Sequence, residues 1–370
     1  MRKKIAIIGA GIGGLTLANL LQNSSNFDFI IYEKNETLNL DEGFGIQLAV
    51  NSISILNQIG FSSLNKSEFF NPAKLDFYSN QDKVCDLDLT QFNTDKDKYT
   101  TLKRSSLIKI LKNRLFSNLI KFNKSIEGVE QNQNNIKINF VDGETDEVDY
   151  LIVCDGVFSS TKSIIENQKY KPNYYDAIAV RTIVNREEVK DFDKNNISLL
   201  MSSNAHAVLY AINKKEYNLV TIIRSKIKNF EKINNLDFIK AILKNSILKN
   251  NNSLTSLFEG DLACWAIYTS EKPIVSKFKN VFYLGDAFYT FPPTFAQGAS
   301  QSIEAAKELY DLLIENKQNI KNIYFDKRFK KTNMINNRSR LNYFVFHISH
   351  PFFKIFSPCF DIFIHYIDSP

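Results

Sequence analysis

The glycine-rich turn at residues 9–14 constrains the fold more than any other part of this chain. Its sequence is GAGIGG; it follows the unbroken apolar run 5–8 and precedes a segment with leucines at helical spacing. An unbroken apolar run is typical of a parallel strand that is buried on both faces. Between a strand and a helix, Gly9-x-Gly11-x-x-Gly14 is the dinucleotide-binding fingerprint. The sequence therefore predicts a Rossmann-type βαβ unit.

Each glycine of such a turn has a physical task. The first permits the tight turn, the second lets the backbone approach a pyrophosphate, and the third lets helix and strand pack closely. Glu33 closes the next apolar run, about 20 residues further on, where a carboxylate accepts hydrogen bonds from ribose hydroxyls. We expect Gly9, Gly11, Gly13, Gly14 and Glu33 to bind the cofactor. The alternative is a glycine turn needed only for packing, with Glu33 merely solvated.

The remaining pattern predicts an α/β fold in which a sheet-rich domain interrupts the Rossmann-type domain, with helices at the C-terminal end. Buried-strand signals recur at 150–153 and 281–284, alternating strands fill 177–224, and a helical stretch follows from 299 to 316. We expect three parts. A discontinuous cofactor-binding domain takes 1–72, 100–175 and 270–325, a substrate domain takes 73–99 and 176–269, and a C-terminal helical segment takes 326–370.

The fingerprint does not separate FAD from NAD, but a second motif favours FAD. Residues 281–306, VFYLGDAFYTFPPTFAQGASQSIEAA, resemble the second FAD motif of the class A flavoprotein monooxygenases, the para-hydroxybenzoate hydroxylase-like family. The resemblance implies that Asp286 binds a ribityl hydroxyl and that Gly285 allows close approach. It places Pro292 beside the isoalloxazine ring. Gly298 and Ala299 would begin a helix whose positive end faces the flavin pyrimidine edge.

Two further segments match the same family in the same order along the chain. Residues 154–160, CDGVFSS, resemble its DG motif, a segment that is tied to both FAD and NAD(P)H in relatives, so the resemblance implies that Asp155 binds the cofactor. Arg104, in LKRSSLIKIL, matches an arginine that opens a helix and contacts the flavin. The resemblance covers roughly residues 1 to 325 and is strongest toward the salicylate hydroxylase-like branch.

The chain departs from the family pattern around the expected ring site. Phe288 and Tyr289 stand where relatives usually have alanine and histidine. Ala296 replaces the glycine that usually precedes the Gln-Gly pair, and Lys162 stands near the usual arginine of the DG motif. These changes put substrate and cofactor details in question more than FAD binding itself.

The resemblance implies an FAD-dependent monooxygenase. NADPH or NADH would reduce FAD, O₂ would form a flavin hydroperoxide, and its distal oxygen would hydroxylate a small aromatic substrate, since the cofactor carries such chemistry. With one fingerprint in the chain, NAD(P)H would dock transiently. Three alternatives stay open to different degrees: a flavin-dependent reductase of an isoprenoid lipid, a non-enzymatic FAD-binding protein, and a halogenase, which is disfavoured because its Trp-x-Trp motif is missing.

Residues that touch the substrate should come from the inserted sheet. Arg181, His206, Tyr210 and Tyr268 are candidates to orient a phenol or carboxylate, with Pro292 beside the ring. Arg224 is a further candidate on the same stretch. The alternative is that the tyrosines are core aromatics and the arginines are surface charges.

Composition narrows the partners. The net charge is +6, but lysines and asparagines are spread along the chain instead of forming a basic stripe with aromatics, so we expect no nucleic-acid partner. The four cysteines form no C-x-x-C pair, which argues against metal and disulfide frameworks. We expect no signal peptide and a soluble, cytoplasmic protein of unknown oligomeric state. The aromatic segment 340–368 should pack against the catalytic domains; membrane contact is the alternative.

Overall fold

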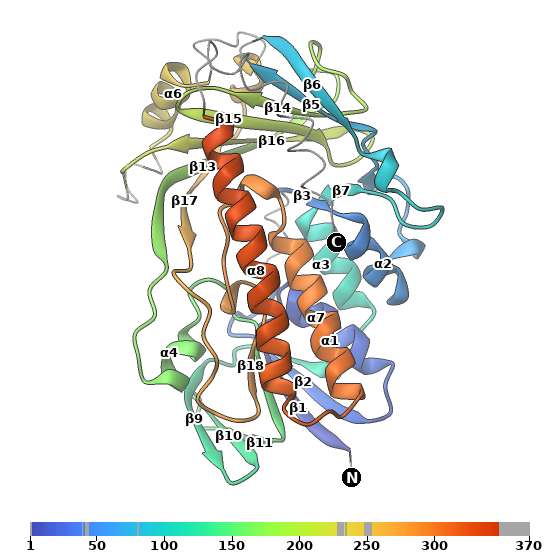
Figure 1. The fold of residues 1–370 in the computed structure, drawn as a ribbon, viewed down its shortest axis with the longest axis vertical. Coiled ribbons are helices and arrows are strands. Elements are labelled where there is room, and N and C mark those ends of the chain that lie inside the picture. Colours follow the sequence, from blue (N-terminus) through green and yellow to red (C-terminus); the bar gives the residue numbers. More distant parts are fainter. Residues whose placement is uncertain are drawn as a thin grey trace.

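The fold joins a parallel sheet at one end of the molecule to a seven-stranded sheet at the other, with one long helix running between them (Figure 1). It is seen in a computed structural model. The structure describes residues 2–38, 40, 44–79, 81–227, 233, 235–247 and 254–347.

The five-stranded sheet is parallel throughout and is covered on both faces. Its order is β18 (Val281–Tyr283), β12 (Tyr150–Val153), β1 (Lys3–Ile8), β2 (Phe27–Tyr32) and β8 (Ile120–Lys121). Alternate side chains of β1 enter different cores, Ile5 and Ile7 on one face and Ala6 and Ile8 on the other. Burial on both faces explains why these strands are apolar without alternation.

Helices cover the first face and a small antiparallel sheet covers the second. The helices are α1 (Ile12–Gln22), α2 (Val50–Gln58), α3 (Arg104–Asn113) and α7 (Gly298–Ile314). The small sheet holds β9 (Ile126–Asn132), β10 (Asn135–Phe140) and β11 (Thr145–Val148), and α4 (Ser160–Glu166) follows β12.

The seven-stranded sheet combines an early hairpin with later strands. Its order is β17 (Ala263–Thr269), β13 (Asn173–Asn185), β16 (Glu216–Arg224), β15 (Ala205–Ala211), β14 (Ile197–Met201), β5 (Lys74–Ser79) and β6 (Asp82–Asp88). One face packs on α6 (Leu236–Asn245). The other face looks toward the parallel-sheet half, and Val345 and Phe346 pack against it.

Two elements connect the halves. A three-stranded sheet of β3 (Gly45–Leu48), β7 (Thr100–Lys103) and β4 (Phe69–Phe70) lies between them. The helix α8 (Ile320–Val345) runs from the parallel sheet to the seven-stranded sheet (Figure 1). The Asn218 side chain on β16 accepts the Gly45 N–H at 2.8 Å, which fixes β3 beneath the larger sheet.

The predicted α/β class is confirmed, as are the strands expected at 5–8, 150–153 and 281–284 and the helix opened by Arg104. The division into three parts stays a prediction; α8 continues without a break across residue 325. Residues 348–368 of the aromatic segment lie outside the described part of the chain. Among the residues described, no helix is long and apolar enough to cross a membrane.

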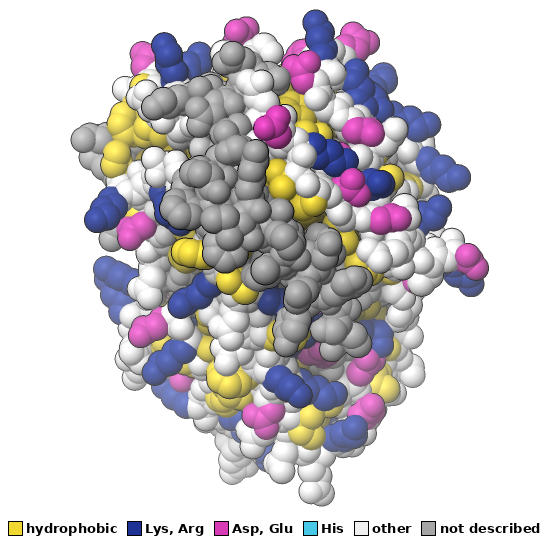
Figure 2. Space-filling view, turned by 45° about the horizontal axis from the view of Figure 1, so that its top comes forward, with side chains coloured by type: hydrophobic (Ala, Val, Ile, Leu, Met, Phe, Trp, Pro, Cys, Tyr) yellow, Lys and Arg dark blue, Asp and Glu magenta, His cyan; other side chains and the backbone are white. Residues whose placement is uncertain are grey.

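The charged side chains of the surface are mixed in sign. Figure 2 shows one face on which lysines and arginines alternate with aspartates and glutamates. Some of the exposed ones pair, for example Arg2 with Asp28 at 3.3 Å. Exposed pairs of this kind contribute little to stability, but they leave no broad field of one sign on the described part of the face shown.

Candidate active site

The glycine turn is closed by backbone contacts that no side chain would allow. Gly9 has φ +100°, and a Cβ there would lie 2.7 Å from the Cys154 carbonyl oxygen. A Cβ on Gly14 would lie 2.2 Å from the Gly9 carbonyl oxygen. Gly11 differs, because a Cβ there would meet no described atom within 4 Å. The fold itself thus requires Gly9 and Gly14. Gly11 instead borders open space, so a ligand can come close to the protein backbone there.

Glu33 shapes the same turn. It is only 8% exposed, its Oε2 accepts the Ala10 N–H at 2.9 Å, and its Oε1 accepts the Asn35 N–H at 3.0 Å. Each carboxylate oxygen can accept a second hydrogen bond. Glu33 is therefore not a merely solvated surface charge, and it keeps acceptor capacity for ribose hydroxyls.

The DG motif adds an unused acceptor beside this turn. Asp155 Oδ2 accepts the Thr161 N–H at 3.2 Å, while the buried Oδ1 has no hydrogen-bond partner among the residues described. Such an oxygen is costly to leave unpaired, so it fits a polar ligand. Lys162, near the usual arginine position, donates through Nζ to the Ala287 carbonyl at 2.9 Å. The lysine thus ties the DG motif to the loop after β18.

Asp286 and Arg104 approach one another from different elements. Asp286 follows β18, where Gly285 has φ +61°, and Arg104 is the first residue of α3. Burial raises the pKa of the Asp286 carboxyl to about 6, and the charge of Arg104 opposes that rise. A carboxyl held in this way accepts strong hydrogen bonds from a polyol once it is ionised.

The residues present therefore fit FAD: they provide the glycine turn, an acid for the ribose, an unpaired carboxylate oxygen beside the turn and a buried aspartate after β18. A cavity of about 790 Å³ extends from Asp286 toward the seven-stranded sheet. Asp286, Pro292, Gly298 and Ala299 line it on the cofactor side. A Cβ on Gly298, the first residue of α7, would meet no described atom within 4 Å, so that helix terminus is open to a ligand.

On the sheet side, Arg181 and Tyr210 line the cavity together. The Arg181 guanidinium lies 5.9 Å from the centre of the Trp265 ring. Burial lowers the pKa of Arg181, with a further push from Arg104, but a guanidinium stays protonated in proteins. Burial raises the pKa of Tyr210 to about 12, against the opposing effects of Arg181 and of Gln47.

His206 also lines the cavity, and its tautomer follows from its neighbours. His347 Nδ1 lies 2.7 Å from the Tyr343 carbonyl oxygen, so this nitrogen must donate. His347 Nε2 then accepts from His206 Nδ1 at 3.3 Å, which leaves His206 Nε2 unprotonated. Burial lowers the pKa of His206 well below its usual range and that of His347 to about 4, so both are neutral at pH 7.

Other expected residues lie elsewhere. Tyr268 is on β17, with its ring against Phe158 and Tyr174, and does not line the cavity. Arg224 is exposed and lies over the Tyr343 ring at 5.1 Å, also outside the lining. The substitutions Phe288 and Tyr289 are buried in the core on the second face of the parallel sheet, 4% and 6% exposed.

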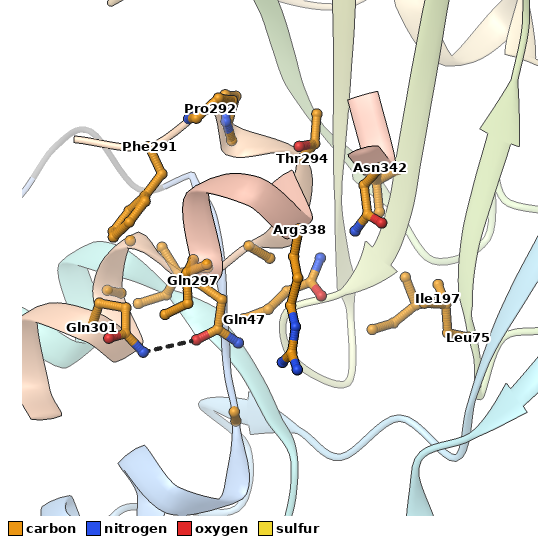
Figure 3. A pocket seen from close by; sticks show the side chains of 18 of the residues that line it. Gln47, Leu75, Ile197, Phe291, Pro292, Thr294, Gln297, Gln301, Arg338 and Asn342 are labelled. Atoms are coloured by element: carbon orange, nitrogen blue, oxygen red, sulfur yellow. Dashed lines mark hydrogen bonds between the residues drawn. The ribbon is translucent and has the colours of Figure 1, made fainter. Parts of the chain in front are cut away.

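Two contributors to the cavity were not expected from the sequence. Gln47 on β3 accepts the Tyr99 hydroxyl at 2.8 Å. Arg338 on α8 extends into the pocket, with Gln297 and Gln301 on one side and Ile197 and Leu75 on the other (Figure 3). No local motif marks either residue, since only the approach of β3 and α8 to the sheet places them there.

Fold and site together define a flavin-dependent oxidoreductase. The chain belongs to the family described as "FAD binding domain", whose model matches residues 2–319. Its relatives are class A flavin monooxygenases, and the chain is an FAD-dependent monooxygenase of this kind. The predicted family is thereby confirmed.

Three relatives give the extent of the similarity. The chain is 25% identical over 316 residues to a 6-hydroxynicotinate 3-monooxygenase from Pseudomonas fluorescens, covering 81% of this chain and 80% of that one. Klebsiella pneumoniae HpxO, solved with FAD and uric acid, superposes with TM-score 0.85 at 16% identity, covering 99% and 96%. A salicylate hydroxylase substrate complex superposes with TM-score 0.80 at 18% identity, covering 100% and 98%. The two structural likenesses establish the fold.

Proposed function

We propose that this enzyme uses NADPH or NADH and O₂ to hydroxylate a small aromatic substrate in the cavity between the flavin residues and the seven-stranded sheet. One observation carries the proposal: the same cavity is lined by Asp286, Pro292 and Gly298 on one side and by Arg181 and Tyr210 on the other. A substrate there would lie against the cofactor. The names of the relatives, which act on hydroxynicotinate and salicylate, support an aromatic substrate.

Bound FAD supplies the redox chemistry, since it accepts hydride from a pyridine nucleotide and reacts with O₂. The protein contributes position and electrostatics. Asp286 and Glu33 hold the polyol and ribose ends through charge-assisted hydrogen bonds. The N-terminus of α7, at Gly298, directs partial positive charge toward the pyrimidine edge, where reduced flavin is negative.

The sheet side orients the substrate and excludes water. Arg181 offers a fixed positive charge to a carboxylate or phenolate, and the Tyr210 hydroxyl stays protonated and can donate or accept a hydrogen bond. Apolar side chains from four other strands complete the wall. A dry, apolar wall protects a reactive intermediate from hydrolysis and strengthens the polar contacts that remain.

The test is the visible spectrum of the purified protein with NADPH or NADH, in air and without oxygen, with and without a panel of phenolic acids. We expect flavin bands that bleach faster with one compound, oxygen consumption that depends on that compound, and a hydroxylated product. The control is Gly11→Ala protein, which we expect to fold like the parent but to bind FAD more weakly.

Other outcomes separate the rival functions. Product formation without oxygen would favour a reductase, such as one acting on an isoprenoid lipid. FAD binding with no substrate-stimulated oxidation of NAD(P)H would favour a non-enzymatic flavoprotein. A protein that cannot take up FAD would overturn the proposal altogether.

A further inference from the structure

The cavity follows one row of side chains across the seven-stranded sheet. Arg181 on β13 is the register partner of Val220, Val220 of Val208, Val208 of Leu199, and Leu199 of Phe77. All five line the cavity. Register partners share one face of a sheet, so the row forms a continuous floor that begins with a charge and continues with four apolar residues.

The length of this floor exceeds that of a single aromatic ring. Five neighbouring strands are separated by four gaps of about 4.8 Å, so the row spans about 19 Å. Its cofactor end is the Arg181 end, as a chain of contacts shows. Arg181 lies over the Trp265 ring, and that ring packs edge-on against Phe44. The Phe44 carbonyl accepts the backbone N–H of Arg104, the first residue of α3, at 2.9 Å. The Phe77 end therefore lies far from the flavin residues.

Walls at the far end are apolar as well. Leu75 and Ile197, themselves register partners, line the cavity there, and Figure 3 shows them next to one another. At the end of α8, Val345 and Phe346 pack against this face of the sheet and also line the cavity. Further lining at this end comes from Leu87, Leu89 and Phe92.

Polarity thus changes along the cavity. Arg181 brings positive charge to the part that faces the flavin residues, and Arg338 of α8 extends between that part and the far end (Figure 3). Among the residues that the structure describes, β5, β14 and β6 contribute no charged side chain to the lining of the far part. A monocyclic acid would fill only the near part. The remaining apolar surface would stay in contact with water, which is unfavourable in proportion to its area.

We propose that the substrate is an amphipathic aromatic compound, an acidic or phenolic ring that carries a linear apolar chain. The ring lies at Arg181 beside the flavin, and the chain lies along Val220, Val208, Leu199 and Phe77. This inference rests on the proposed function, since it assigns the substrate class of the same site.

The first experiment measures binding to the oxidised FAD-loaded enzyme by the change in the flavin spectrum. The probes are salicylates without a chain and with propyl, pentyl and heptyl chains. We expect the Kd to fall by about threefold to fourfold for each methylene that enters the apolar part, the amount that burial of one such group contributes. Dependence on chain length should end where the chain reaches Phe77.

Variants locate the chain along the row. Val208→Phe narrows the floor close to the ring, and Leu199→Phe narrows it one strand further on. Each Kd is compared with that of salicylate in the same variant, at the FAD content of the parent. We expect Val208→Phe to abolish the gain for all chains and Leu199→Phe to abolish it only for the longer ones. Val141→Phe, at a position that is 66% exposed and lies next to β10 in the small antiparallel sheet, is the matched control.

The outcomes distinguish the two proposals. Salicylate binding and hydroxylation without any dependence on chain length would overturn the amphipathic substrate and leave the proposed function standing. A flavoprotein that binds no member of the series would also overturn the amphipathic substrate. Failure to take up FAD would overturn the proposed function first.

Discussion

The cofactor cradle, which is the glycine turn at residues 9–14, is shaped by backbone atoms, whereas the substrate cavity is shaped by side chains. In the cradle, backbone meets backbone: the positions of Gly9 and Gly14 leave no room for a Cβ. In the cavity, the backbone is an ordinary sheet, and side chains such as Arg181 and Val208 form the surface. A substitution in a site made of backbone contacts therefore destabilises the fold. A substitution in a site lined by side chains can alter which ligand binds while the fold is kept.

Within the cradle, two glycines of one turn separate packing from ligand contact. Gly14→Ala places a methyl group against the Gly9 carbonyl oxygen, so we expect it to destabilise the apoprotein by about 3 kcal/mol. Gly11→Ala fits the open space and the extended backbone there, so stability should stay within about 0.5 kcal/mol of the parent.

FAD titration completes the comparison. Gly11→Ala should weaken FAD binding at least tenfold, about 1.4 kcal/mol, because the methyl group takes the place of the approaching pyrophosphate. Urea unfolding of each apoprotein gives the stability. If Gly11→Ala bound FAD as tightly as the parent, the assignment of the cradle to the pyrophosphate would be wrong.

The same contrast explains what the sequence could predict. The expected FAD-binding residues lie within contiguous motifs, so spacing and resemblance to the family's motifs predict Gly9, Glu33, Asp155 and Asp286. Their roles toward FAD stay predictions. Their chemistry is local: a turn, a strand end and a helix start. The family and the α/β class follow from such local signals.

The cavity depends on strand register, which local patterns do not specify. Arg181 and Phe77 are about a hundred residues apart in the sequence, and only the pairing of β14 with β5 brings the early hairpin into the sheet. Tyr268 has the residue type expected of a substrate contact, but its strand lies beyond β13 at the sheet edge. Arg338 lies in α8, where polar residues are spread along the helix, so the sequence does not indicate which of its sides faces the cavity.

Loss of one charge tests the cavity. We expect Arg181→Ala to raise the Kd and KM of an aromatic carboxylate by about tenfold to a hundredfold, as for loss of a hydrogen bond to a charged group. A neutral phenol should be affected much less. Arg224→Ala, which removes an exposed arginine outside the lining, is the control. Unchanged kinetics in Arg181→Ala would remove this residue from the site.

The buried histidine pair makes the cavity wall sensitive to acid. Below pH 6.5 the unfolded chain protonates each imidazole, whereas folded His347 stays neutral until about pH 4 and burial also lowers the pKa of His206 well below its usual value. The contribution of the two neutral histidines to the free energy of unfolding should thus be complete above pH 6.5 and be lost as the pH drops toward 4. The free energy of unfolding should fall by about 1 kcal/mol per histidine between pH 6.5 and 5.5. Urea unfolding at both pH values measures this.

A variant checks the source of that acid sensitivity. His347→Gln keeps a side chain that can hydrogen-bond to His206 but does not titrate, so its stability should fall less over the same interval. An unchanged fall would place the sensitivity in other groups.

The affinity for FAD should depend on pH through Asp286. Its carboxyl has a pKa of about 6 in the cofactor-free protein, and hydrogen bonds from the ribityl chain favour the ionised form. FAD affinity should be nearly constant above about pH 7, fall roughly twofold by pH 6 and roughly fivefold more between pH 6 and 5, because the carboxyl must lose its proton on binding. Asp286→Asn should bind FAD more weakly at pH 7 but without this dependence. A parent affinity that is flat down to pH 5 would contradict the assignment.

The smallest expected effect lies at the loop that joins cradle and cavity. Ala296 has φ +51°, a left-handed conformation that costs a residue with a Cβ roughly 1 to 2 kcal/mol. Glycine, usual here in the family, removes that cost but loses more entropy on folding, up to about 1 kcal/mol. Ala296→Gly should therefore stabilise the protein by only about 0.5 kcal/mol. Because the loop lines the cavity beside Pro292, a change in the flavin spectrum without a change in stability would instead show that Ala296 acts on the ring environment.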